Sequence, residues 1–414
     1  MAKKIVQTYR DEGVYSVTRK IYERTITLGG NFRLSPKKID LNFIPVTPQL
    51  IDIRNANYLD SPYIKPKKIN KETLNIAWVS PPVGKGGGGH TTISRFVKYL
   101  QSKGHNITFF IYNNNTIKQS AIEAKNIFEK CYDLQVEVKG LDNFSGSDYD
   151  VVFATSWETA YGVFNLKTNA HKFYFVQDFE PIFYGVGSRY KLAEATYKFG
   201  FYGITAGKWL TKKVSEYGMN ADYFDFGADI EIYKPNKDIS KKKKVCFYAR
   251  AHTERRGFEL GIMALQIFKE KHPEYEIEFF GQDMSGYDIP FKFIDRGILN
   301  KEELAELYQE SVACLVLSLT NVSLLPLELL AAGCTPVMND GENNTMVLGE
   351  NKDIVYTEAY PLSLAEGLSR VVERKDINEN SKKMSNNVKD LSWTKSYEKV
   401  EKIILREVTN VSKK

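Results

Sequence analysis

From residue 74 onward, short apolar runs alternate along the chain with longer segments whose apolar positions recur at helical spacing. The run at 74–79 ends at Ser80-Pro81-Pro82 and a glycine cluster. The next segment carries four apolar residues at the i, i+3, i+4, i+7 spacing of one helix face, namely Ile93, Phe96, Val97 and Leu100. Further strand-like runs follow at 107–112, 149–154, 172–177, 202–206 and 223–226. This alternation predicts a doubly wound, mostly parallel sheet.

A polar, charged interruption separates this series from a second one. It comprises Lys234-Pro235-Asn236-Lys237-Asp238 and the lysine run at 241–244. Beyond it, strand-like runs lie at 245–249, 275–280, 291–294, 313–317, 335–338 and 353–356, and helix-like runs at 258–271, 301–311, 322–332 and 362–373. The sequence therefore predicts an α/β protein with two Rossmann-like domains, at 71–235 and 236–390, facing a central cleft in which ligands bind.

The two ends of the chain lie outside these domains. Residues 1–70 form a basic extension that we expect to pack on the first domain, and residues 391–414 carry a C-terminal helix. Val14, Val17, Ile21 and Leu28 recur at helical spacing, which suits either a helix docked on the body or a helix on a membrane surface. Proline-containing segments at 44–48 and 63–67 are typical of an extended connector.

Composition and charge narrow the function. The 414 residues are 43% hydrophobic and 26% charged, as in globular proteins. The net charge of +6 is spread along the chain, which argues against a nucleic-acid partner. The N-terminus lacks a signal-peptide pattern, no apolar run reaches membrane-spanning length, and the four cysteines lack metal-ligand spacing. We expect a cytoplasmic protein, either free or peripheral at the inner membrane face.

A glycine-rich loop follows the first strand. Gly84, Gly86 and Gly89 satisfy the dinucleotide pattern G-x-G-x-x-G, but Asn113-Asn114-Asn115 stands where that fold needs an acidic residue. His90-Thr91 stands where a P-loop needs Lys-Ser/Thr. We interpret Gly87, Gly88, His90 and Thr91 as a loop that contacts a ligand at the cleft; a flexible surface turn is the alternative.

Two arginines mark the second domain. Arg250 ends a strand and Arg256 begins the next helix. Arginine binds phosphate oxygens through two parallel hydrogen bonds and keeps its charge. Because basic residues at a helix N-terminus oppose the helix dipole, their placement favours an anion between them. The alternative is a solvated patch formed by Arg255 and Arg256.

The third candidate element is the segment from Ser318 to Glu328, which starts at a strand end and enters another helix. Ser323 and Leu324 lie at that start, where backbone N–H groups can donate to a diphosphate. Glu328 falls about one turn further in, where a carboxylate can accept hydrogen bonds from ribose hydroxyls. A surface salt bridge is the alternative for Glu328.

These elements together resemble family 4 of the retaining GT-B glycosyltransferases. The resemblance rests on Arg250, Arg256-Gly257, Pro326-Leu327-Glu328 and Ala332-Gly333-Cys334-Thr335-Pro336-Val337. It covers most of residues 74–400 and is strongest in the C-terminal half. It implies the GT-B fold and transfer of a sugar from a nucleotide-sugar, with no metal and no further cofactor.

The resemblance also implies roles for single residues. Arg250 and Arg256 would hold the donor diphosphate, and Glu328 the ribose. The family places another glutamate at the position eight residues before Glu328, with seven residues between the two, and gives it a role toward the transferred sugar; this chain has Thr320 there. Asn321 or Ser323 would take over part of that role. Gly281, Ile298 and Leu299 follow strand ends that lie near the nucleotide, with the last two flanking the base.

A further group of residues resembles the bacterial rhamnosyltransferases of surface-polysaccharide and S-layer glycan assembly. It comprises Tyr174-Phe175-Val176-Gln177-Asp178-Phe179-Glu180-Pro181, Tyr197, Ala206-Gly207 and Trp209-Leu210. Those enzymes use dTDP-β-L-rhamnose as donor and a glycan or lipid-linked glycan as acceptor. We expect the acceptor to bind the first domain through the glycine loop, Trp157 and Gln177, with Asp178 and Glu180 as catalytic candidates; local helix capping is the alternative for these two acids.

Other functions are a glycosidase, a metal-dependent transferase, an epimerase and a nucleotide-sugar sensor. The chain has no pair of acids at a fixed spacing that marks a glycosidase. Asp148-Tyr149-Asp150 leads into a strand rather than following one, which argues against a metal site. A GT-B-fold nucleotide-sugar epimerase and a non-catalytic nucleotide-sugar sensor remain as alternatives to a transferase, and so does a different nucleotide-sugar donor.

Overall fold

The computed structural model describes residues 48–60, 66, 68–235, 241–349, 351–388 and 390–409. These residues all belong to one compact unit that spans residues 46–414. The helix expected around residues 14–28 lies outside the described residues, as do most of the two proline-containing connectors and residues 236–238 of the polar interruption.

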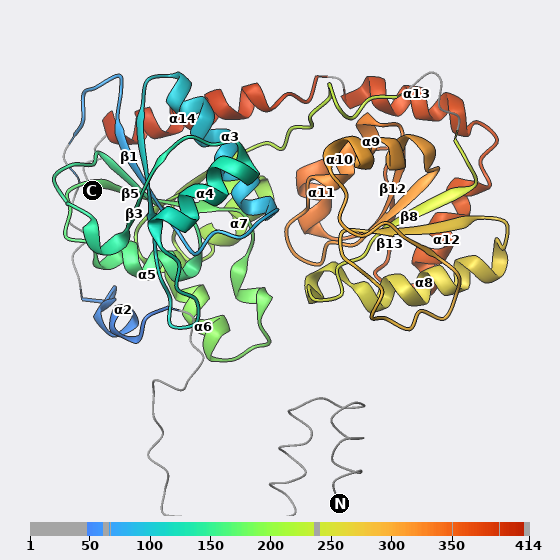
Figure 1. Cartoon of the computed structure of the whole chain (residues 1–414), viewed down its shortest axis with the longest axis horizontal. Helices are drawn as coiled ribbons and strands as arrows, with labels where there is room; N and C mark the ends of the chain where they lie inside the picture. The colour runs from blue at the N-terminus through green and yellow to red at the C-terminus, as the bar shows by residue number, and fades with distance from the viewer. Residues whose placement is uncertain are drawn as a thin grey trace, which may run out of the picture. The chain divides into compact units, whose positions relative to one another are not determined.

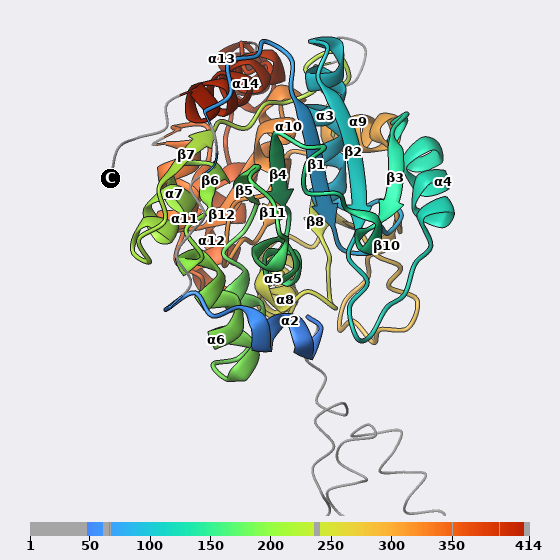
Figure 2. The same cartoon turned by 90° about the vertical axis from the view of Figure 1, so that its left-hand side faces the viewer.

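The first lobe is built on a sheet of seven parallel strands. They are β1 (Asn75–Ser80), β2 (Asn106–Ile111), β3 (Glu137–Gly140), β4 (Val151–Ala154), β5 (His171–Val176), β6 (Tyr202–Ala206) and β7 (Ala221–Phe224). Their order is β3-β2-β1-β4-β5-β6-β7, and every neighbouring pair is parallel (Figure 2). The mostly parallel sheet predicted from the sequence is therefore confirmed.

Helices connect these strands. They are α2 (Leu50–Asn55), α3 (Gly88–Ser102), α4 (Ala121–Tyr132), α5 (Trp157–Asn165), α6 (Ser188–Ala195) and α7 (Lys208–Ser215), with single 3₁₀ turns η2 (Leu141–Asn143), η3 (Glu180–Phe183) and η4 (Thr196–Lys198). Helix α2 precedes the sheet and contacts α5, where the Asn165 side chain donates to the Asp52 carbonyl at 2.9 Å.

The second lobe repeats the arrangement with six parallel strands. These are β8 (Lys244–Tyr248), β9 (Glu276–Phe280), β10 (Ile294–Asp295), β11 (Ala313–Val316), β12 (Thr335–Asn339) and β13 (Val355–Thr357), in the order β10-β9-β8-β11-β12-β13. Its helices are α8 (Phe258–Lys271), α9 (Lys301–Glu310), α10 (Leu325–Ala331), α11 (Glu342–Leu348), α12 (Pro361–Val372) and α13 (Ile377–Val388), preceded by the 3₁₀ turn η5 (Glu254–Arg256). Figure 1 shows helices on both faces of each sheet.

The strand order reverses at one point in each sheet. The first sheet reverses between β1 and β4, and the second between β8 and β11. In open parallel sheets, ligands bind outside the carboxyl ends of the strands at this switch point. The residues that follow β1, β4, β8 and β11 are therefore the first place to look for a site.

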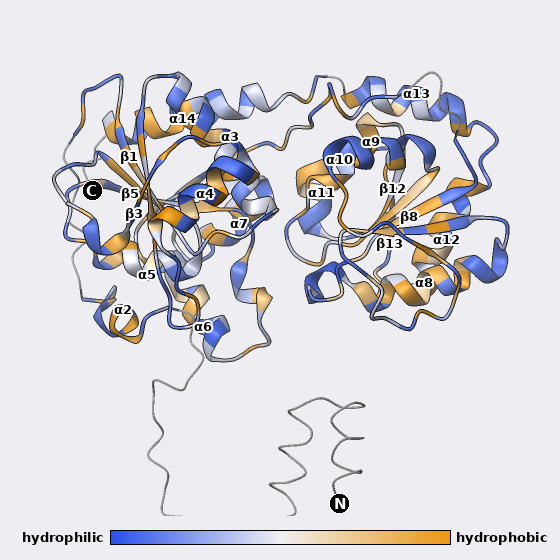
Figure 3. Cartoon of the chain, viewed as in Figure 1, coloured by the Kyte–Doolittle hydropathy of each residue, from blue (hydrophilic) through white to orange (hydrophobic). Residues whose placement is uncertain are grey.

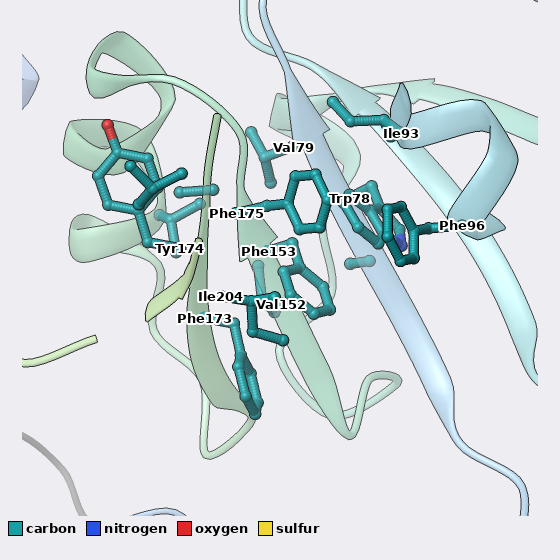
Figure 4. Packing of buried hydrophobic residues seen from close by; sticks show 14 of the residues in the cluster. Trp78, Val79, Ile93, Phe96, Val152, Phe153, Phe173, Tyr174, Phe175 and Ile204 are labelled. Atoms are coloured by element: carbon teal, nitrogen blue, oxygen red, sulfur yellow. The ribbon is translucent and has the colours of Figure 1, made fainter. Parts of the chain in front are cut away.

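The core of the first lobe is aromatic. Trp78 on β1 stacks on Phe153 of β4 with ring centroids 4.2 Å apart, and Phe175 on β5 meets Trp78 edge-on at 5.3 Å. Phe96 of α3 packs against Phe175 from the covering layer (Figure 4). Strands covered on both faces read as continuous apolar runs, which is why both sheets appear as hydrophobic interiors in Figure 3.

The chain crosses between the lobes twice. After α13 it returns to the first lobe as α14 (Trp393–Thr409), which buries Trp393, Val400 and Ile404 in the first-lobe core. The returning segment runs beside the outgoing one, because the Ala228 N–H donates to the Leu391 carbonyl at 3.0 Å. Among the described helices, none combines the length and apolar character needed to cross a bilayer.

Several elements differ from the sequence prediction. Strand β3 and helices α11 and α13 were not predicted, because they carry many polar residues and show no clear apolar period. The strand expected at 291–294 is only the two-residue β10. The helix expected from residue 322 begins at Leu325, with Pro326 in its first turn, where proline is tolerated because that N–H has no helical partner.

We expect Gly261→Ala to destabilise the second lobe. A Cβ at Gly261 of α8 would come within 2.2 Å of the Phe247 ring on β8, so the helix would have to move off the sheet. Overpacking of this kind costs about 1–3 kcal/mol, measurable as a lower midpoint in urea unfolding. Gly286→Ala is the matched control, since a Cβ there meets nothing within 4 Å; equal midpoints for both variants would contradict the packing described.

Candidate functional site

Four loops lie close together at the carboxyl ends of the two sheets, three of them after strands at the switch points and one after β5, the neighbour of β4. The glycine-rich loop follows β1 and Gln177-Asp178 follows β5, while Arg250 follows β8 and the segment 318–324 follows β11. Hydrogen bonds join the two lobes here, so the loops are neighbours in space. The structure thus brings together most of the residues that the sequence analysis singled out.

Asp178 of the first lobe is held by the second. Its Oδ1 accepts from the Asn321 backbone N–H at 2.9 Å, its Oδ2 accepts from the Thr320 hydroxyl at 3.0 Å, and Arg255 Nε lies 3.4 Å from the same Oδ2. Burial raises the pKa of Asp178, while the Asn321 N–H and the charges of Arg256 and Arg255 act in the opposite direction. Because both oxygens are engaged, the expectation of a carboxylate free to hold acceptor hydroxyls is corrected for this conformation.

Asn321 completes this contact from the other side. Its side-chain Nδ2 donates to the carbonyls of Gln177 and Ala206, each at 2.9 Å. Asn321 is 1% exposed and Thr320 2% exposed, so neither faces an open donor pocket in this conformation. In this conformation they join the lobes, and their contact with the transferred sugar stays a prediction. We call Asp178, Thr320 and Asn321 the interlobe clasp.

Three asparagines support the clasp from behind. The Ser318 N–H donates to Asn339 Oδ1 at 2.8 Å, and Asn339 Nδ2 donates back to the Ser318 carbonyl at 3.0 Å. Asn343 donates to the carbonyls of Ser318 and Thr320, and Asn344 to those of Ser318 and Asn339. The sequence analysis missed this cluster, since only the fold brings the end of β12 and the start of α11 against the loop after β11.

Three guanidinium groups converge near the clasp. Arg250 Nη1 donates to the Gly281 carbonyl at 3.1 Å, Arg256 Nη1 donates to the Ser318 hydroxyl at 2.5 Å, and Arg255 lies over the Phe183 ring at 4.0 Å. Burial lowers the pKa of Arg256; Asp178 acts in the opposite direction, and the charges of Arg255 and Arg250 lower the pKa further. The site carries more cationic than anionic charge, which suits an anionic ligand.

The local structure around Arg256 differs from the prediction. Arg255 and Arg256 lie in η5, and α8 starts only at Phe258 after Gly257, whose φ is 56°. Arg256 therefore precedes the helix instead of beginning it. Arg255 was not assigned a role from the sequence, although it contacts Asp178; its adjacency to Arg256 was the only available signal.

Ser323 and Leu324 also precede their helix. Leu324 is the N-cap of α10 and Ser323 comes before it, so the expectation that both lie within the helix start is shifted by the later beginning of α10. Among the described residues, Ser323 Oγ and Asn321 Oδ1 are buried without a hydrogen-bond partner. Such orphaned polar atoms are costly and mark a place where a ligand can bind.

Glu328 on α10 lies beside an ion cluster between the lobes. Arg95 of α3 makes two hydrogen bonds to Asp229, at 2.5 and 2.7 Å, and Lys301 of α9 approaches the same carboxylate at 2.9 Å. Burial raises the pKa of Glu328 to about 7, helped by Asp229 and opposed by Arg95 and Lys301. Among the described residues no ion pair includes Glu328, so the alternative of a surface salt bridge is not what the structure shows.

A cavity of about 710 Å³ opens next to this cluster. Its walls come from α3, the end of α4, the outgoing interlobe segment, Lys301 and the start of α14. Thr91, Arg95, Asp229 and Trp393 are among the lining residues. The cavity therefore extends between the lobes from the side of the glycine loop toward the crossing segments.

Trp157 and Glu180 are structural in this conformation. Trp157 is 1% exposed, and its Nε1 donates to the Tyr184 hydroxyl at 3.1 Å. Glu180 Oε2 accepts from the Trp157 N–H at the start of α5, and burial together with Glu158 raises the pKa of Glu180 well above its usual range. Glu180 thus caps a helix, as the alternative for it held, although it caps α5 and not the helix that follows it. The catalytic role of Glu180 and the acceptor contact of Trp157 stay predictions.

The glycine loop lies where the sequence placed it. Gly87 is the N-cap of α3, and Gly88 is its first residue. A Cβ at Gly89 would lie 3.3 Å from the Gln177 amide, so this loop approaches the clasp closely. Burial lowers the pKa of His90 to about 4, so His90 is neutral, and its Nε2 lies 3.2 Å from the Ser80 hydroxyl.

The remaining residues predicted to bind the donor are Gly281, Ile298 and Leu299, and their surroundings differ. Gly281 has φ of 100° and its carbonyl accepts from Arg250, which ties it to the site. Ile298 is 83% exposed, whereas Leu299 is partly buried against the second-lobe core. The two side chains therefore differ in exposure, and their contact with the base stays a prediction.

Comparison with known proteins matches this geometry to a family. Residues 112–205 match the N-terminal domain of WsaF, and residues 243–369 match its C-terminal domain. The two matches together cover more than half of the 414 residues and include one half of the site each. The chain belongs to the WsaF family.

This WsaF-family chain also has a much longer relative. It is 32% identical over 295 residues to the O-antigen biosynthesis protein RfbC of Myxococcus xanthus, a match that covers 69% of this chain. The chain spans about a quarter of that relative, 23% of its length.

Solved structures establish the GT-B fold of the WsaF-family chain. Sucrose-phosphate synthase from Thermosynechococcus elongatus superposes with a TM-score of 0.61 at 12% identity, over 81% of this chain and 98% of that one. Alr3699/HepE of Anabaena in complex with UDP-glucose gives 0.61 at 13% identity, over 80% and 99%. The two-domain GT-B architecture predicted from the sequence is confirmed, and the chain is a WsaF-like glycosyltransferase.

Carboxylates outside the site take structural roles. Asp150 accepts from the Asn75 N–H at 2.9 Å and pairs with Lys71, which explains why Asp148-Tyr149-Asp150 leads into β4. The part of the chain that the structure describes contains no group of three or more His, Cys, Asp or Glu arranged to hold a metal ion.

We expect the clasp to show energetic coupling. In a double-mutant cycle, Thr320→Val and Asp178→Ala should couple by about 0.5–3 kcal/mol, because contacting residues in one hydrogen-bond network are not additive. Urea unfolding of the four proteins measures the coupling. Thr320→Val combined with Lys71→Ala is the control and should be additive within about 0.5 kcal/mol; the same additivity for the clasp pair would refute it.

Proposed function

We propose that this WsaF-like glycosyltransferase transfers rhamnose from dTDP-β-L-rhamnose to a rhamnan-type glycan acceptor during assembly of a cell-surface glycan. The reaction is metal-independent and retains the configuration of the sugar. The relative RfbC is described as an O-antigen biosynthesis protein, which supports a role in polysaccharide assembly. The resemblance of the segment around Asp178 to rhamnosyltransferases supports the choice of sugar.

One observation carries the proposal: three guanidinium groups lie together at the end of the second sheet, with a single carboxylate among them. The charges of Arg255 and Arg256 act on Asp178, and the like charges of Arg255 and Arg250 lower the pKa of Arg256. A nucleotide-sugar diphosphate supplies the missing negative charge. Arginine matches phosphate oxygens through paired hydrogen bonds, so the site is suited to hold the diphosphate between the lobes.

The same charges act on the reaction. When the acceptor hydroxyl forms a bond to the anomeric carbon, the bond from that carbon to the phosphate oxygen breaks and charge grows on the diphosphate. The hydroxyl proton passes to a phosphate oxygen on the same face, and the nucleoside diphosphate leaves. Fixed cationic donors at the growing charge lower the barrier, and lobe closure excludes water.

We assign contacts with the transferred sugar and with the nucleoside to residues of the same loops. Thr320 takes the place of a carboxylate, and a 6-deoxy sugar lacks the 6-hydroxyl that such a group would bind. We assign to Glu328 the acceptance of a hydrogen bond from the 3′-hydroxyl of the donor's deoxyribose, and to the Ser323 hydroxyl, which has no hydrogen-bond partner among the described residues, a hydrogen bond to the donor. Asp178 and Glu180 then serve catalysis by holding the lobes and α5 in place, with the acceptor on the side of Gly87, Gly88 and Gln177.

Binding and product formation test the proposal separately. Thermal-shift measurements with dTDP, UDP and GDP should show the largest stabilisation with dTDP. A ligand that binds the folded state and not the unfolded state raises the melting temperature, and more so the tighter it binds. Incubation of dTDP-β-L-rhamnose with a synthetic rhamnosylated acceptor should add one deoxyhexose, seen by mass spectrometry. An isomerised sugar without acceptor would instead indicate an epimerase, and binding without turnover a sensor.

We expect Arg250→Ala and Arg256→Ala each to lower kcat/KM by about 100- to 1,000-fold, as loss of one charge-stabilising donor does. The physical reason is that each guanidinium offsets charge that grows on the leaving diphosphate. Steady-state kinetics with varied donor measure the loss. Arg370→Ala, at an exposed position of α12, is the matched control and should keep full activity; unchanged turnover in both site variants would remove the assignment.

We expect donor affinity to rise with pH through Glu328. Because burial holds the pKa of Glu328 at about 7, the carboxyl is mostly protonated at about pH 6 and mostly ionised at about pH 8. An ionised carboxylate accepts hydrogen bonds more strongly, so affinity for dTDP should rise roughly fivefold over that range. Isothermal titration calorimetry with Glu328→Gln should show a flat profile, while Glu366→Gln on α12 should keep the wild-type slope.

A further inference from the structure

Helix α11 of the second lobe packs on α7 of the first lobe, and Figures 1 and 2 show the two helices facing each other. Met346 and Val347 of α11 pack against the hydrophobic core of the first lobe. A Cβ at Gly207, the N-cap of α7, would come within 2.8 Å of Val347. Lys212 of α7 forms an ion pair with Glu342 of α11. We call these five residues the α7–α11 seam.

The first turn of the same helix holds the loop at 318–320. Asn343 Nδ2 donates to the Ser318 carbonyl at 2.8 Å and also to the Thr320 carbonyl. The buried Asn344 donates through its Nδ2 to the same Ser318 carbonyl at 3.3 Å. One helix of seven residues therefore carries both the contact with the first lobe and the bonds that fix this loop.

The loop at 318–320 in turn holds the arginines of the second lobe. The Ser318 hydroxyl accepts from Arg256 Nη1 at 2.5 Å, and the Leu319 N–H donates to the Arg255 carbonyl at 3.0 Å. Within the described part of the chain, that hydroxyl is the only group to which the Arg256 side chain donates a hydrogen bond. A guanidinium has five N–H donors, so the others remain for a ligand.

These contacts form one continuous series from the first lobe to Arg256. The seam places α11, the asparagines of α11 place the loop, and the loop places the guanidinium. Packed elements shift between distinct arrangements rather than deform continuously. A first lobe that no longer fits against α11 would therefore leave the helix, the loop and Arg256 less well fixed.

We propose that Asn343 is a positioning residue for the donor, and that the α7–α11 seam sets its position, so that Arg256 is in place only when the two lobes fit together. This inference rests on the proposed function above, in which Arg256 holds the donor diphosphate. A group that is ordered in advance loses less conformational freedom on binding, and it acts on developing charge without rearranging. Neither Asn343 nor the seam needs to touch the substrate for this role.

The first test compares two valines of the second lobe that lose the same methyl groups. Val347→Ala weakens the seam, whereas Val372→Ala on α12 changes a residue inside the core of the second lobe. Calorimetry measures dTDP binding, and hydrogen–deuterium exchange measures backbone order. We expect Val347→Ala to weaken dTDP binding roughly tenfold and to speed exchange in peptides that cover residues 316–324, while Val372→Ala changes neither.

A charge swap across the seam gives a rescue that a role within one lobe would not give. Lys212→Glu places two carboxylates together and should change affinity and exchange in the same direction as Val347→Ala. Lys212→Glu combined with Glu342→Lys restores an ion pair and should return both towards their wild-type values. Lys213→Glu is the control and should change neither, because Lys213 pairs with Glu216 within the first lobe.

A double-mutant cycle tests whether the seam acts through Asn343. Asn343→Ala removes both bonds to the loop and should weaken dTDP binding by itself. Val347→Ala should then cost no further affinity in the Asn343→Ala protein, because substitutions that act through one contact are not additive. Full additivity of the two losses would overturn the inference.

The outcomes separate this inference from the proposed function. Wild-type dTDP affinity in both Val347→Ala and Lys212→Glu, with affinity lost in Arg256→Ala, would overturn the inference and leave the proposed function intact. Faster exchange at 316–324 with unchanged dTDP affinity would overturn it as well. A wild-type protein that binds none of dTDP, UDP and GDP would refute the proposed function itself. Lys212 and Glu342 are about half exposed, so the charge variants keep the inference testable if Val347→Ala does not fold.

Discussion

The structure depends on one buried carboxylate that is shared between two lobes. Asp178 leaves the end of β5 and is compensated almost entirely from the other lobe, by the Asn321 N–H, the Thr320 hydroxyl and the Arg255 guanidinium. A buried charge without such partners is strongly unfavourable. Each lobe therefore stabilises a group of the other, and the carboxyl ends of the two sheets are kept facing each other.

Because the two sheets reverse their strand order at the same point, the clasp joins the ligand-binding edge of one sheet to that of the other. In each lobe the order reverses between the first and fourth strands, so the loops that follow those strands open on a crevice. The clasp brings the crevice of one lobe against that of the other. Arg255 of the second lobe then contacts Asp178, and Gln177 beside it approaches the glycine loop of the first lobe, so both loops lie close to the same contact.

Both halves of the site are shaped by uncharged groups behind the residues that would meet the substrates. In the second lobe Asn339, Asn343 and Asn344 bind the carbonyls of the loop after β11. In the first lobe Tyr132 and Gln119 bind the backbone of the glycine loop. Neutral supports fix the geometry without cancelling the positive charge of the arginines, so the electrostatic preference for an anion is preserved.

The sequence by itself determined the two α/β lobes, because buried parallel strands and amphipathic helices have periods that local residues express. It also singled out Arg250, Arg256, the glycine loop and Glu328 as candidates, since each lies just after a strand or close to the start of a helix. Only the tertiary structure decided what their neighbours are. Asp178, Thr320 and Asn321 were read as substrate contacts but meet each other across 142 or more residues. Trp157 proved to be a buried core residue, and Tyr132 showed no motif, because a hydrogen bond between distant segments depends on packing that no local period encodes.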